Sequence, residues 1–170
     1  MINQLFAPLV IGLAIATAIT PLPIAAQVCP PPAPSPAPAT TLSTLEQSVH
    51  TQINQYRASR SLPPLTLDSR ISQQARTHSQ NMASGLVAFG HDGFSQRVQV
   101  ITQVIPLSSA AENVAYNQGS TDPARQAVQG WIASSGHQAN IVGSYNLTGI
   151  GVAMNASGRY YFTQIFIRTR

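Results

Sequence analysis

"LTGIGVAMNASGRYYFTQIFIRTR", from Leu147 to Arg170, is the stretch that decides the fold class. Residues 147–154 and 159–168 are rich in β-branched and aromatic side chains, which favour strands. The connection between them, "NASG", contains the small and polar residues typical of a turn, so the stretch predicts a β-hairpin. The fragment "GIG" lies inside the first predicted strand and is therefore no dinucleotide-binding fingerprint.

The chain before this hairpin has the apolar spacing of helices rather than the alternation of strands. A first helix is predicted from about residue 42; Ser43 or Thr44 can cap it, and the prolines of "SLPPL" end it. Its apolar stripe consists of Leu42, Leu45, Val49, Ile53 and Tyr56. Asp68 caps a second predicted helix, which ends near Gly85. The inner face of that helix consists of Ile71, Ala75, His78 and Met82.

A third helix is predicted from Asp122, which caps it, and Pro123, which suits the first helical position. Its buried side consists of Ala124, Ala127, Val128, Trp131 and Ile132. A further strand is predicted at "ENVAY", Glu112 to Tyr116. Because most helices precede the strands, the sequence favours an α+β layered domain over a parallel sheet.

The chain of 170 residues is expected to comprise a signal peptide at 1–26, a proline-rich linker at 27–41 and one domain at 42–170. Residues 5–19 are almost wholly apolar, and small residues suited to cleavage follow as far as Ala26. No Lys or Arg precedes this apolar run, so an uncleaved anchor is the alternative. Together these features predict a secreted protein, extracellular or periplasmic.

Composition excludes several classes of protein. All nine basic residues are arginines, against five acids, and they are scattered from Arg57 to Arg170. Nucleic-acid binding needs a concentrated basic face, so no nucleic-acid partner is predicted. The single cysteine, Cys29, cannot form an internal disulfide, so an apolar core must hold the domain together, and 44% hydrophobic residues make that feasible. We expect a monomer.

The sequence contains no G-x-S-x-G, P-loop or H-E-x-x-H motif. The candidates that remain are His91 in "FGHDGFSQR", Glu112 in "AENVAY" and His137 in "SSGHQANIV". Each has an ordinary structural interpretation as well. His91 can be a solvated loop residue and Glu112 a surface charge or a cap. His137 can lie in the first turn of a short helix capped by Ser135.

Several separated segments carry a resemblance to a known family. They are "INQYRASRSLPPLTLDSRISQQARTHSQNMA", "GH", "AENVAY", "AVQGWIASSGHQANIVG", "TGIGVAM" and "YYFTQIF". In this order they resemble the bacterial branch of the CAP superfamily, which includes cysteine-rich secretory, antigen 5 and pathogenesis-related proteins. The resemblance covers residues 42–170 and implies a CAP (SCP-like) α-β-α sandwich, with a small antiparallel sheet between helical layers. It also implies a central cleft whose His and Glu side chains bind divalent metal in relatives.

The resemblance assigns three cleft residues. His91 matches the first cleft histidine, and Glu112 matches the Glu of the family's G-E-N segment, although Ala111 stands in place of its Gly. His137 matches the S-P-G-H histidine of bacterial members, although Ser135 stands in place of the Pro. Two imidazoles and a carboxylate are a set that Zn²⁺ accepts with an open fourth position. The candidate metal ligands are therefore His91, Glu112 and His137.

The chain also departs from the eukaryotic pattern. Those relatives place a Glu three residues after the Trp and a His two residues before the T-Q pair; here Ser134 and Tyr161 stand at these positions. Tyr161 is counted with the cleft as a hydrogen-bond donor, but the set of two His and two Glu is not reproduced. Since neutral imidazole both donates and accepts hydrogen bonds, the cleft could instead bind a polar ligand without metal.

Two functions follow from this cleft. The first is a non-enzymatic extracellular binding module for a small molecule, lipid, glycan or protein partner. The second is a hydrolase in which His91, Glu112 and His137 hold a metal, such as Zn²⁺, that activates water. The hydrolase also needs a general base and an oxyanion stabiliser, and the remaining acids offer no obvious base. The sequence therefore favours the binding module over the enzyme.

Overall fold

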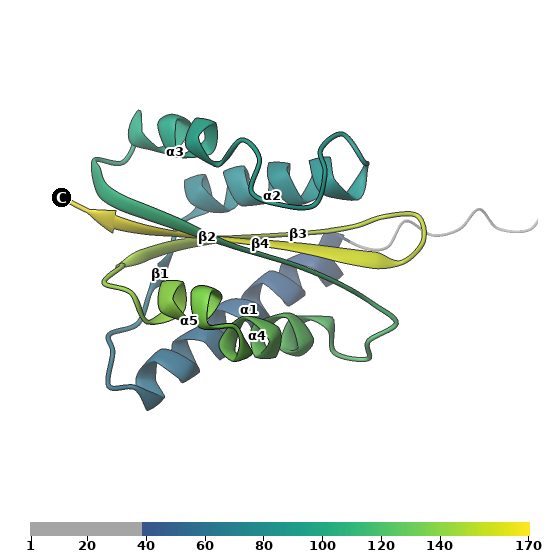
Figure 1. Ribbon diagram of the computed structural model, residues 1–170, viewed down its shortest axis with the longest axis horizontal. Helices are drawn as coiled ribbons and strands as arrows, with labels where there is room; N and C mark the ends of the chain where they lie inside the picture. The colour runs from purple at the N-terminus through teal and green to yellow at the C-terminus, as the bar shows by residue number, and fades with distance from the viewer. Residues whose placement is uncertain (1–38) are drawn as a thin grey trace, which may run out of the picture. The chain divides into compact units, whose positions relative to one another are not determined.

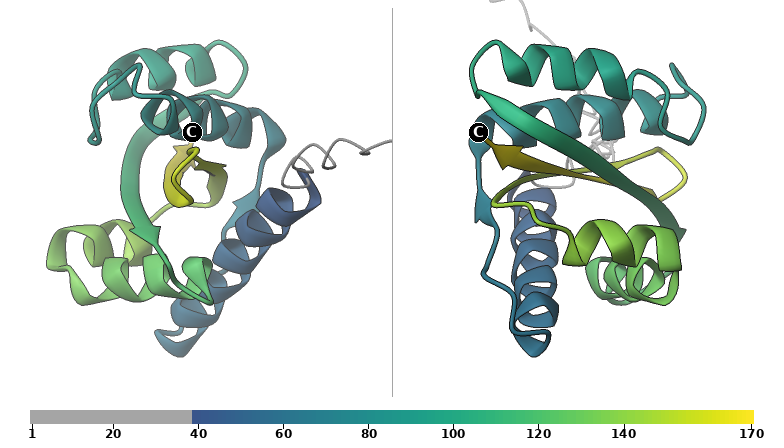
Figure 2. Two further views of the ribbon diagram at one scale, coloured as in Figure 1. Left: turned by 90° about the vertical axis from the view of Figure 1, so that its right-hand side faces the viewer. Right: turned by 60° about the vertical axis from the view of Figure 1, so that its left-hand side comes forward.

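The computed structural model describes residues 39–170, so the predicted signal peptide and most of the predicted linker lie outside the described residues. The elements are α1 (Ala39–Ser59), β1 (Thr66–Leu67), α2 (Ser69–Ala83), α3 (Phe94–Thr102), β2 (Leu107–Gln118), α4 (Pro123–Ala133), α5 (Ser135–Val142), β3 (Leu147–Met154) and β4 (Arg159–Thr169). The sheet forms the middle layer, with α2 and α3 on one face and α1, α4 and α5 on the other (Figures 1 and 2). The predicted α-β-α sandwich is confirmed.

The helices that have clear start signals lie where the sequence predicts them. Asp68 accepts a hydrogen bond from the backbone N–H of Arg70, and Asp122 accepts one from that of Arg125, so both predicted caps are confirmed. α1 begins at Ala39, slightly earlier than predicted and inside the predicted linker. In the described part of the chain, no helix is long and apolar enough to cross a membrane.

The sheet has the strand order β1-β3-β4-β2. β4 is antiparallel to both β3 and β2, with Ile165 opposite Gly149 on one side and Glu112 on the other. This confirms the predicted hairpin and the predicted strand at "ENVAY". β1 was not predicted, because its two residues are too few to form a pattern. It runs parallel to β3, so the sheet is mixed rather than wholly antiparallel.

β4 is buried on both faces because a helical layer covers each of them. Phe162 and Phe166 belong to one core cluster, whereas Ile165 and Ile167 belong to another. The first cluster consists of Val49, Ile53, Leu65, Ala124, Ala127, Val128, Trp131, Ile141, Ile150, Val152, Phe162 and Phe166. The second consists of Ile71, Ala75, Ile101, Ile105, Ile165 and Ile167. Side chains that alternate along one strand therefore join the sheet to both helical layers.

The "GIG" fragment has a packing role. α2 lies so close to β3 that a Cβ atom at Gly149 would overlap the backbone of Ile71 and Ser72. A Cβ at Gly151 would overlap the backbone of Ala75 and its neighbour in α2. Only glycine permits this approach of two backbones. The fragment thus sets the spacing between helix and strand, which agrees with its exclusion as a nucleotide motif.

α3 (Phe94–Thr102) is the helix that the sequence did not predict. Its N-cap is Gly93, with a φ of 78°, and no side chain caps it. Its first turn contains no acidic residue, and Ile101 is its single fully buried residue. The usual start signals and a strong apolar stripe are therefore both missing. This matters for the site, because α3 carries Arg97.

Candidate functional site

Glu112 is the centre of a buried polar cluster. It lies on β2 with 6% of its surface exposed. Arg97 donates from Nε to Glu112 Oε2 at 3.0 Å and from Nη2 to Oε1 at 2.8 Å. The Nδ1–H of His91 donates to Oε1 at 3.0 Å. The structure thus brings His91 and Glu112 together, and it adds Arg97 as a two-pronged partner for the carboxylate.

The cluster continues inward to His78 on α2. Arg97 Nη1 lies 3.1 Å from His78 Nδ1, and His78 Nε2 lies 2.9 Å from the carbonyl oxygen of Gly90. Because a guanidinium can only donate, His78 Nδ1 accepts, and its Nε2–H donates to Gly90. Burial is the main cause that lowers the pKa of the His78 imidazole, so this ring is neutral. A continuous chain therefore runs from buried His78 through Arg97 and Glu112 to His91, whose side chain is half exposed.

His137 lies on α5, on the other side of β2. Its ring Nδ1 is 2.8 Å from Ser134 Oγ. Ser134, not Ser135, is the N-cap residue of α5; its side chain makes no cap bond and instead lies within hydrogen-bond distance of His137. Burial, and secondarily the charge of His91, lowers the pKa of His137. The imidazole of His137 is therefore neutral at neutral pH.

Two asparagines attach α5 to β2. Asn113 donates to the backbone oxygen of His137 at 3.1 Å, and Asn140 donates to Asn113 Oδ1 at 2.9 Å. Asn113 is fully buried. The "EN" of β2 and the "HQAN" of α5 therefore meet through paired amides. This contact fixes the position of the His137 backbone relative to the sheet.

Arg57 attaches the other end of α5. Its side chain is 1% exposed and donates to the carbonyl oxygens of Ile141 at 2.7 Å and Gly143 at 3.0 Å. It also donates to the carbonyl of Pro63 at 2.9 Å. A cation suits the last carbonyls of a helix, where the helix dipole is negative. α5, and with it His137, is thus held at both ends.

The expected three-ligand metal set is not assembled. In residues 39–170, no three His, Cys, Asp or Glu side chains lie close enough to hold a metal ion. Both Glu112 oxygens accept hydrogen bonds from Arg97, and the guanidinium charge next to the carboxylate opposes a metal cation. His91 also turns its Nδ1 toward Glu112, while His137 is on α5 and bonds Ser134. The residues present do not fit a His91–Glu112–His137 metal centre.

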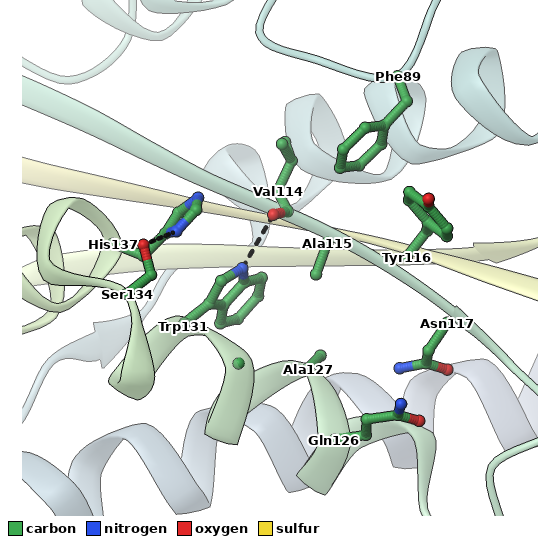
Figure 3. A pocket seen from close by; sticks show the side chains of 11 residues that line it. Phe89, Val114, Ala115, Tyr116, Asn117, Gln126, Ala127, Trp131, Ser134 and His137 are labelled. Atoms are coloured by element: carbon green, nitrogen blue, oxygen red, sulfur yellow. Dashed lines mark hydrogen bonds between the residues drawn. The ribbon is translucent and has the colours of Figure 1, made fainter.

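A cavity of about 380 Å³ opens beside His137, and we call it the aromatic pocket (Figure 3). It is lined by Phe89, Val114, Ala115, Tyr116, Asn117, Gln126, Ala127, Gly130, Trp131, Ser134 and His137. The rings of Phe89 and Tyr116 meet edge to face with centroids 4.8 Å apart, and both are about half exposed. None of the lining residues is Asp, Glu, Lys or Arg, and His137 is neutral, so the pocket is uncharged.

Trp131 forms a fixed wall of the aromatic pocket. It is 1% exposed, and its Nε1–H donates to the backbone oxygen of Val114 at 3.0 Å. The predicted inward position of Trp131 on its helix is confirmed. Tyr161, in contrast, does not line the pocket: it is 8% exposed, packs with Met82 and Val114, and lies opposite Tyr116 on the neighbouring strand. Tyr161 thus supports a ring of the pocket rather than facing its interior.

Gly130 keeps part of the pocket open. It lies inside α4 with no positive φ, and a Cβ built on it would meet no atom within 4 Å. Neither backbone conformation nor packing therefore requires glycine there. Glycine inside a helix costs about 0.5–1 kcal/mol relative to alanine. The cavity is the one local feature that a larger side chain at this position would remove.

Comparison with known proteins decides the family. The sequence profile of CAP, the cysteine-rich secretory protein family, matches residues 50–166. The protein is a member of the CAP family. It is 31% identical over 131 residues to the uncharacterized protein YkwD of Bacillus subtilis (strain 168), covering 75% of this chain and 49% of YkwD.

Solved structures share the CAP fold. An extracellular protein containing a SCP domain from Bacillus anthracis str. Ames has 26% identity and a TM-score of 0.62, covering 79% of this chain and 45% of that chain. An outer surface protein from Borrelia burgdorferi has 15% identity and a TM-score of 0.64, covering 75% of this chain and 94% of that chain. The present chain spans about half the length of the two Bacillus proteins.

Sequence reasoning about the CAP domain missed Arg97, Gly130 and Phe89. Arg97 lies in a helix without start signals, so nothing marked it as the partner of Glu112. Gly130 resembles any exposed glycine of a helix until the cavity next to it is known. Phe89 lies in a loop, and an aromatic loop residue becomes a recognisable site only when a second ring, here Tyr116, is placed beside it.

Proposed function

We propose that this CAP domain is a secreted, non-enzymatic binding module whose ligand occupies the aromatic pocket. The main support for this proposal is the pocket itself. It is uncharged, has a volume of about 380 Å³ and is lined by the aromatic rings of Phe89, Tyr116 and Trp131. Small-molecule sites have volumes of about 300–1,000 Å³ and combine apolar walls with a few polar groups. The polar groups here are the side chains of Asn117, Gln126, Ser134 and His137, together with the hydroxyl of Tyr116.

The walls of the pocket are held before any ligand arrives. Trp131 is fixed by its bond to Val114, and the α5 backbone at His137 by its bond with Asn113. Pre-organised walls reduce the ordering cost of binding. Rigid walls are expected in a binding module and support this proposal.

The arrangement does not favour the metal-assisted hydrolase. The carboxylate of Glu112 is occupied by Arg97, so it is not placed to act as a free base or a metal ligand. Glu112 does orient the His91 ring, as carboxylates do for catalytic histidines. However, within the described residues no Ser, Thr or Cys side chain bonds to His91 as a nucleophile would. The observed contacts of Glu112 and His91 therefore favour a binding function over hydrolysis.

Secretion is part of the proposal. It is supported by the apolar stretch at residues 5–19, the proline-rich stretch at 27–41 and the likeness to an extracellular Bacillus protein. Mass spectrometry of the protein from culture medium should find an N-terminus near Gln27. A product found in the membrane that retains Met1 would contradict cleavage.

The binding proposal is tested with a neutral aromatic probe, 4-methylphenol. Trp131 is the single tryptophan, so its fluorescence reports on the pocket. We expect 4-methylphenol to change the fluorescence of the full-length protein but not that of Gly130→Leu, in which the added side chain should occupy part of the pocket. Gly136→Leu is the matched control, because Gly136 is an exposed helical glycine outside the pocket, also with no atom within 4 Å of a built Cβ.

Three outcomes would contradict the proposed function. The first is no response of the wild-type protein to 4-methylphenol, and the second is an equal response of Gly130→Leu. The third is hydrolysis of chromogenic ester, phosphoester or glycoside substrates that depends on added Zn²⁺ or Mn²⁺ and is lost in His91→Ala.

A further inference from the structure

We propose that the aromatic pocket binds one ring of an uncharged oligosaccharide. This inference rests on the proposed function and names the class of ligand. It rests on three features of the pocket. These are the exposed rings of Phe89 and Tyr116, the uncharged polar side chains, and the space next to Gly130.

The exposed rings carry the first step. Phe89 and Tyr116 form an edge-to-face corner at the entrance, with 46% and 50% of their surfaces exposed. Two half-exposed rings side by side form an apolar patch, and such patches mark interaction sites. The face of an aromatic ring is electron-rich, and the C–H groups on one face of a pyranose are slightly positive. A sugar ring therefore suits this corner better than an anion does.

The Arg159 guanidinium strengthens this argument. It lies 5.0 Å from the centroid of the Tyr116 ring, but Arg159 does not line the pocket. This cation–π contact helps to hold the ring of Tyr116 from outside the pocket lining. No arginine lines the pocket, so an acidic ligand would find no guanidinium among the lining residues.

The polar groups carry the second step. The side chain of Gln126 is exposed and makes no hydrogen bond within residues 39–170. His137 uses Nδ1 for Ser134, and its Nε2 has no partner in the same part of the chain. An amide and a neutral imidazole both donate and accept, as hydroxyl and acetamido groups of sugars require. A purely apolar ligand such as an acyl chain would leave these groups without partners.

Gly130 carries the third step. It lines the pocket from α4, and a Cβ built on it would meet no atom within 4 Å. A pyranose ring stacked on an aromatic side chain needs such space on its second face. The half-exposed rings also place the pocket at the surface, so neighbouring sugar units can continue outward. An oligosaccharide therefore fits better than a fully enclosed small molecule.

The experiment titrates the full-length protein with three tetrasaccharides by calorimetry and Trp131 fluorescence. Cellotetraose has only hydroxyl groups, chitotetraose adds acetamido groups, and tetragalacturonic acid carries negative charges. We expect at least one neutral tetrasaccharide to bind and tetragalacturonic acid to bind at least about tenfold more weakly. Gly130→Leu and Tyr116→Ala should each weaken the neutral sugar by about tenfold or more, and Gly136→Leu should leave it unchanged.

Each other result overturns the inference. Equal binding of the acidic sugar would show that neutrality is not recognised, and sugar binding retained in Gly130→Leu would place the site elsewhere. If no sugar binds while 4-methylphenol still binds the wild type and not Gly130→Leu, the sugar assignment fails but the binding pocket stands. Tighter binding of the uncharged peptide N-acetyl-Ala-Ala-Ala-amide, lost in Gly130→Leu, would assign the pocket to peptides. If neither sugars nor 4-methylphenol bind, both proposals fail.

Discussion

Two glutamates, Glu46 on α1 and Glu112 on β2, are almost equally buried, with 5% and 6% of their surfaces exposed. Each pairs with an arginine through two nitrogen atoms, Glu46 with Arg76 and Glu112 with Arg97. The arginines differ in their contact with water, since the side chain of Arg76 is 40% exposed and that of Arg97 is 11% exposed. The same pair of residue types thus occurs once at the surface and once in the interior.

The third partner of each carboxylate differs as well. Glu46 accepts a hydrogen bond from the backbone N–H of Val152 at 3.2 Å. A backbone amide does not titrate, so the charge of this partner is fixed. Glu112 accepts from the imidazole of His91, a titratable and half-exposed group. The Glu46 pair therefore ties α1 to the sheet and to α2, whereas the Glu112 pair presents a histidine to solvent. The partners of a buried carboxylate, and not its burial alone, therefore distinguish a structural glutamate from one in a functional site.

The largest expected effect comes from removing the interior arginine. Arg97→Met leaves the buried Glu112 charge without its cation and should lower the free energy of unfolding by about 3–5 kcal/mol. Arg76→Met should cost only about 1 kcal/mol, because the Arg76 side of that pair is 40% exposed and already in contact with water. Urea unfolding of both variants checks this order. Equal losses would mean that the two pairs are equivalent and that the comparison fails.

A smaller effect is expected when both interior charges are removed together. The double variant Arg97→Met with Glu112→Gln leaves no unpaired buried charge, so it should be more stable than Arg97→Met by about 2 kcal/mol. Denaturant unfolding of the wild type, the two single variants and the double variant gives the coupling energy directly. Additive losses in this cycle would show that Arg97 and Glu112 contribute independently.

The pH dependence of stability near neutral pH should come from His78 and His137. The folded-state pKa values of His78 and His137 are lowered, mainly by burial, below the ordinary value of 6.5. As pH falls below about 6.5, the unfolded state takes up protons first, so stability present at pH 7.5 is lost toward pH 5. Each histidine can contribute at most about 1.4 kcal/mol per pH unit.

The variant His137→Gln separates these contributions. It removes one of the two neutral rings, so its unfolding free energy should fall less between pH 7.5 and pH 5 than that of the wild type. Urea melts across this range measure the difference. A fall as steep as in the wild type would show that His137 is not held neutral by the fold.

The smallest expected effect is that of metal. Because Arg97 occupies the Glu112 carboxylate, one equivalent of Zn²⁺ or an excess of EDTA should leave the melting temperature of the wild type unchanged within error. Elemental analysis after dialysis should find less than one Zn²⁺ per chain. A stoichiometric metal content, with a melting temperature that rises on Zn²⁺ addition, would restore the three-ligand centre.

The parts of the fold that were predictable depend on local chemistry. The hairpin follows from the β-branched and aromatic residues around "NASG", and two helices follow from the caps Asp68 and Asp122. α3 and β1 were not predictable, because the first has a glycine cap without a side-chain bond and the second is two residues long. Tertiary packing decides both of these elements.

The candidate site was predictable only in part. His91, Glu112 and His137 were recognised one by one, and the structure joins the first two directly. Their partners depend on contacts between elements distant in the sequence, such as Arg97 on α3 reaching Glu112 on β2. The aromatic pocket depends on shape, since residues from several elements line it and Gly130 adds no side chain to it. Residue types can suggest a set of metal ligands, but they do not reveal which side chain in the fold donates hydrogen bonds to the carboxylate of that set.

The direct contact between α2 and β3 at Gly149 and Gly151 has a mechanical consequence. Two backbones that touch without intervening side chains leave no free volume and no rotamer to adjust, so this seam should be the least compressible part of the domain. The aromatic pocket should be the more compressible region, because hydrostatic pressure favours states in which voids are eliminated. Under pressure, amide signals along the seam should therefore shift least, and those of α4 around Gly130 should shift most.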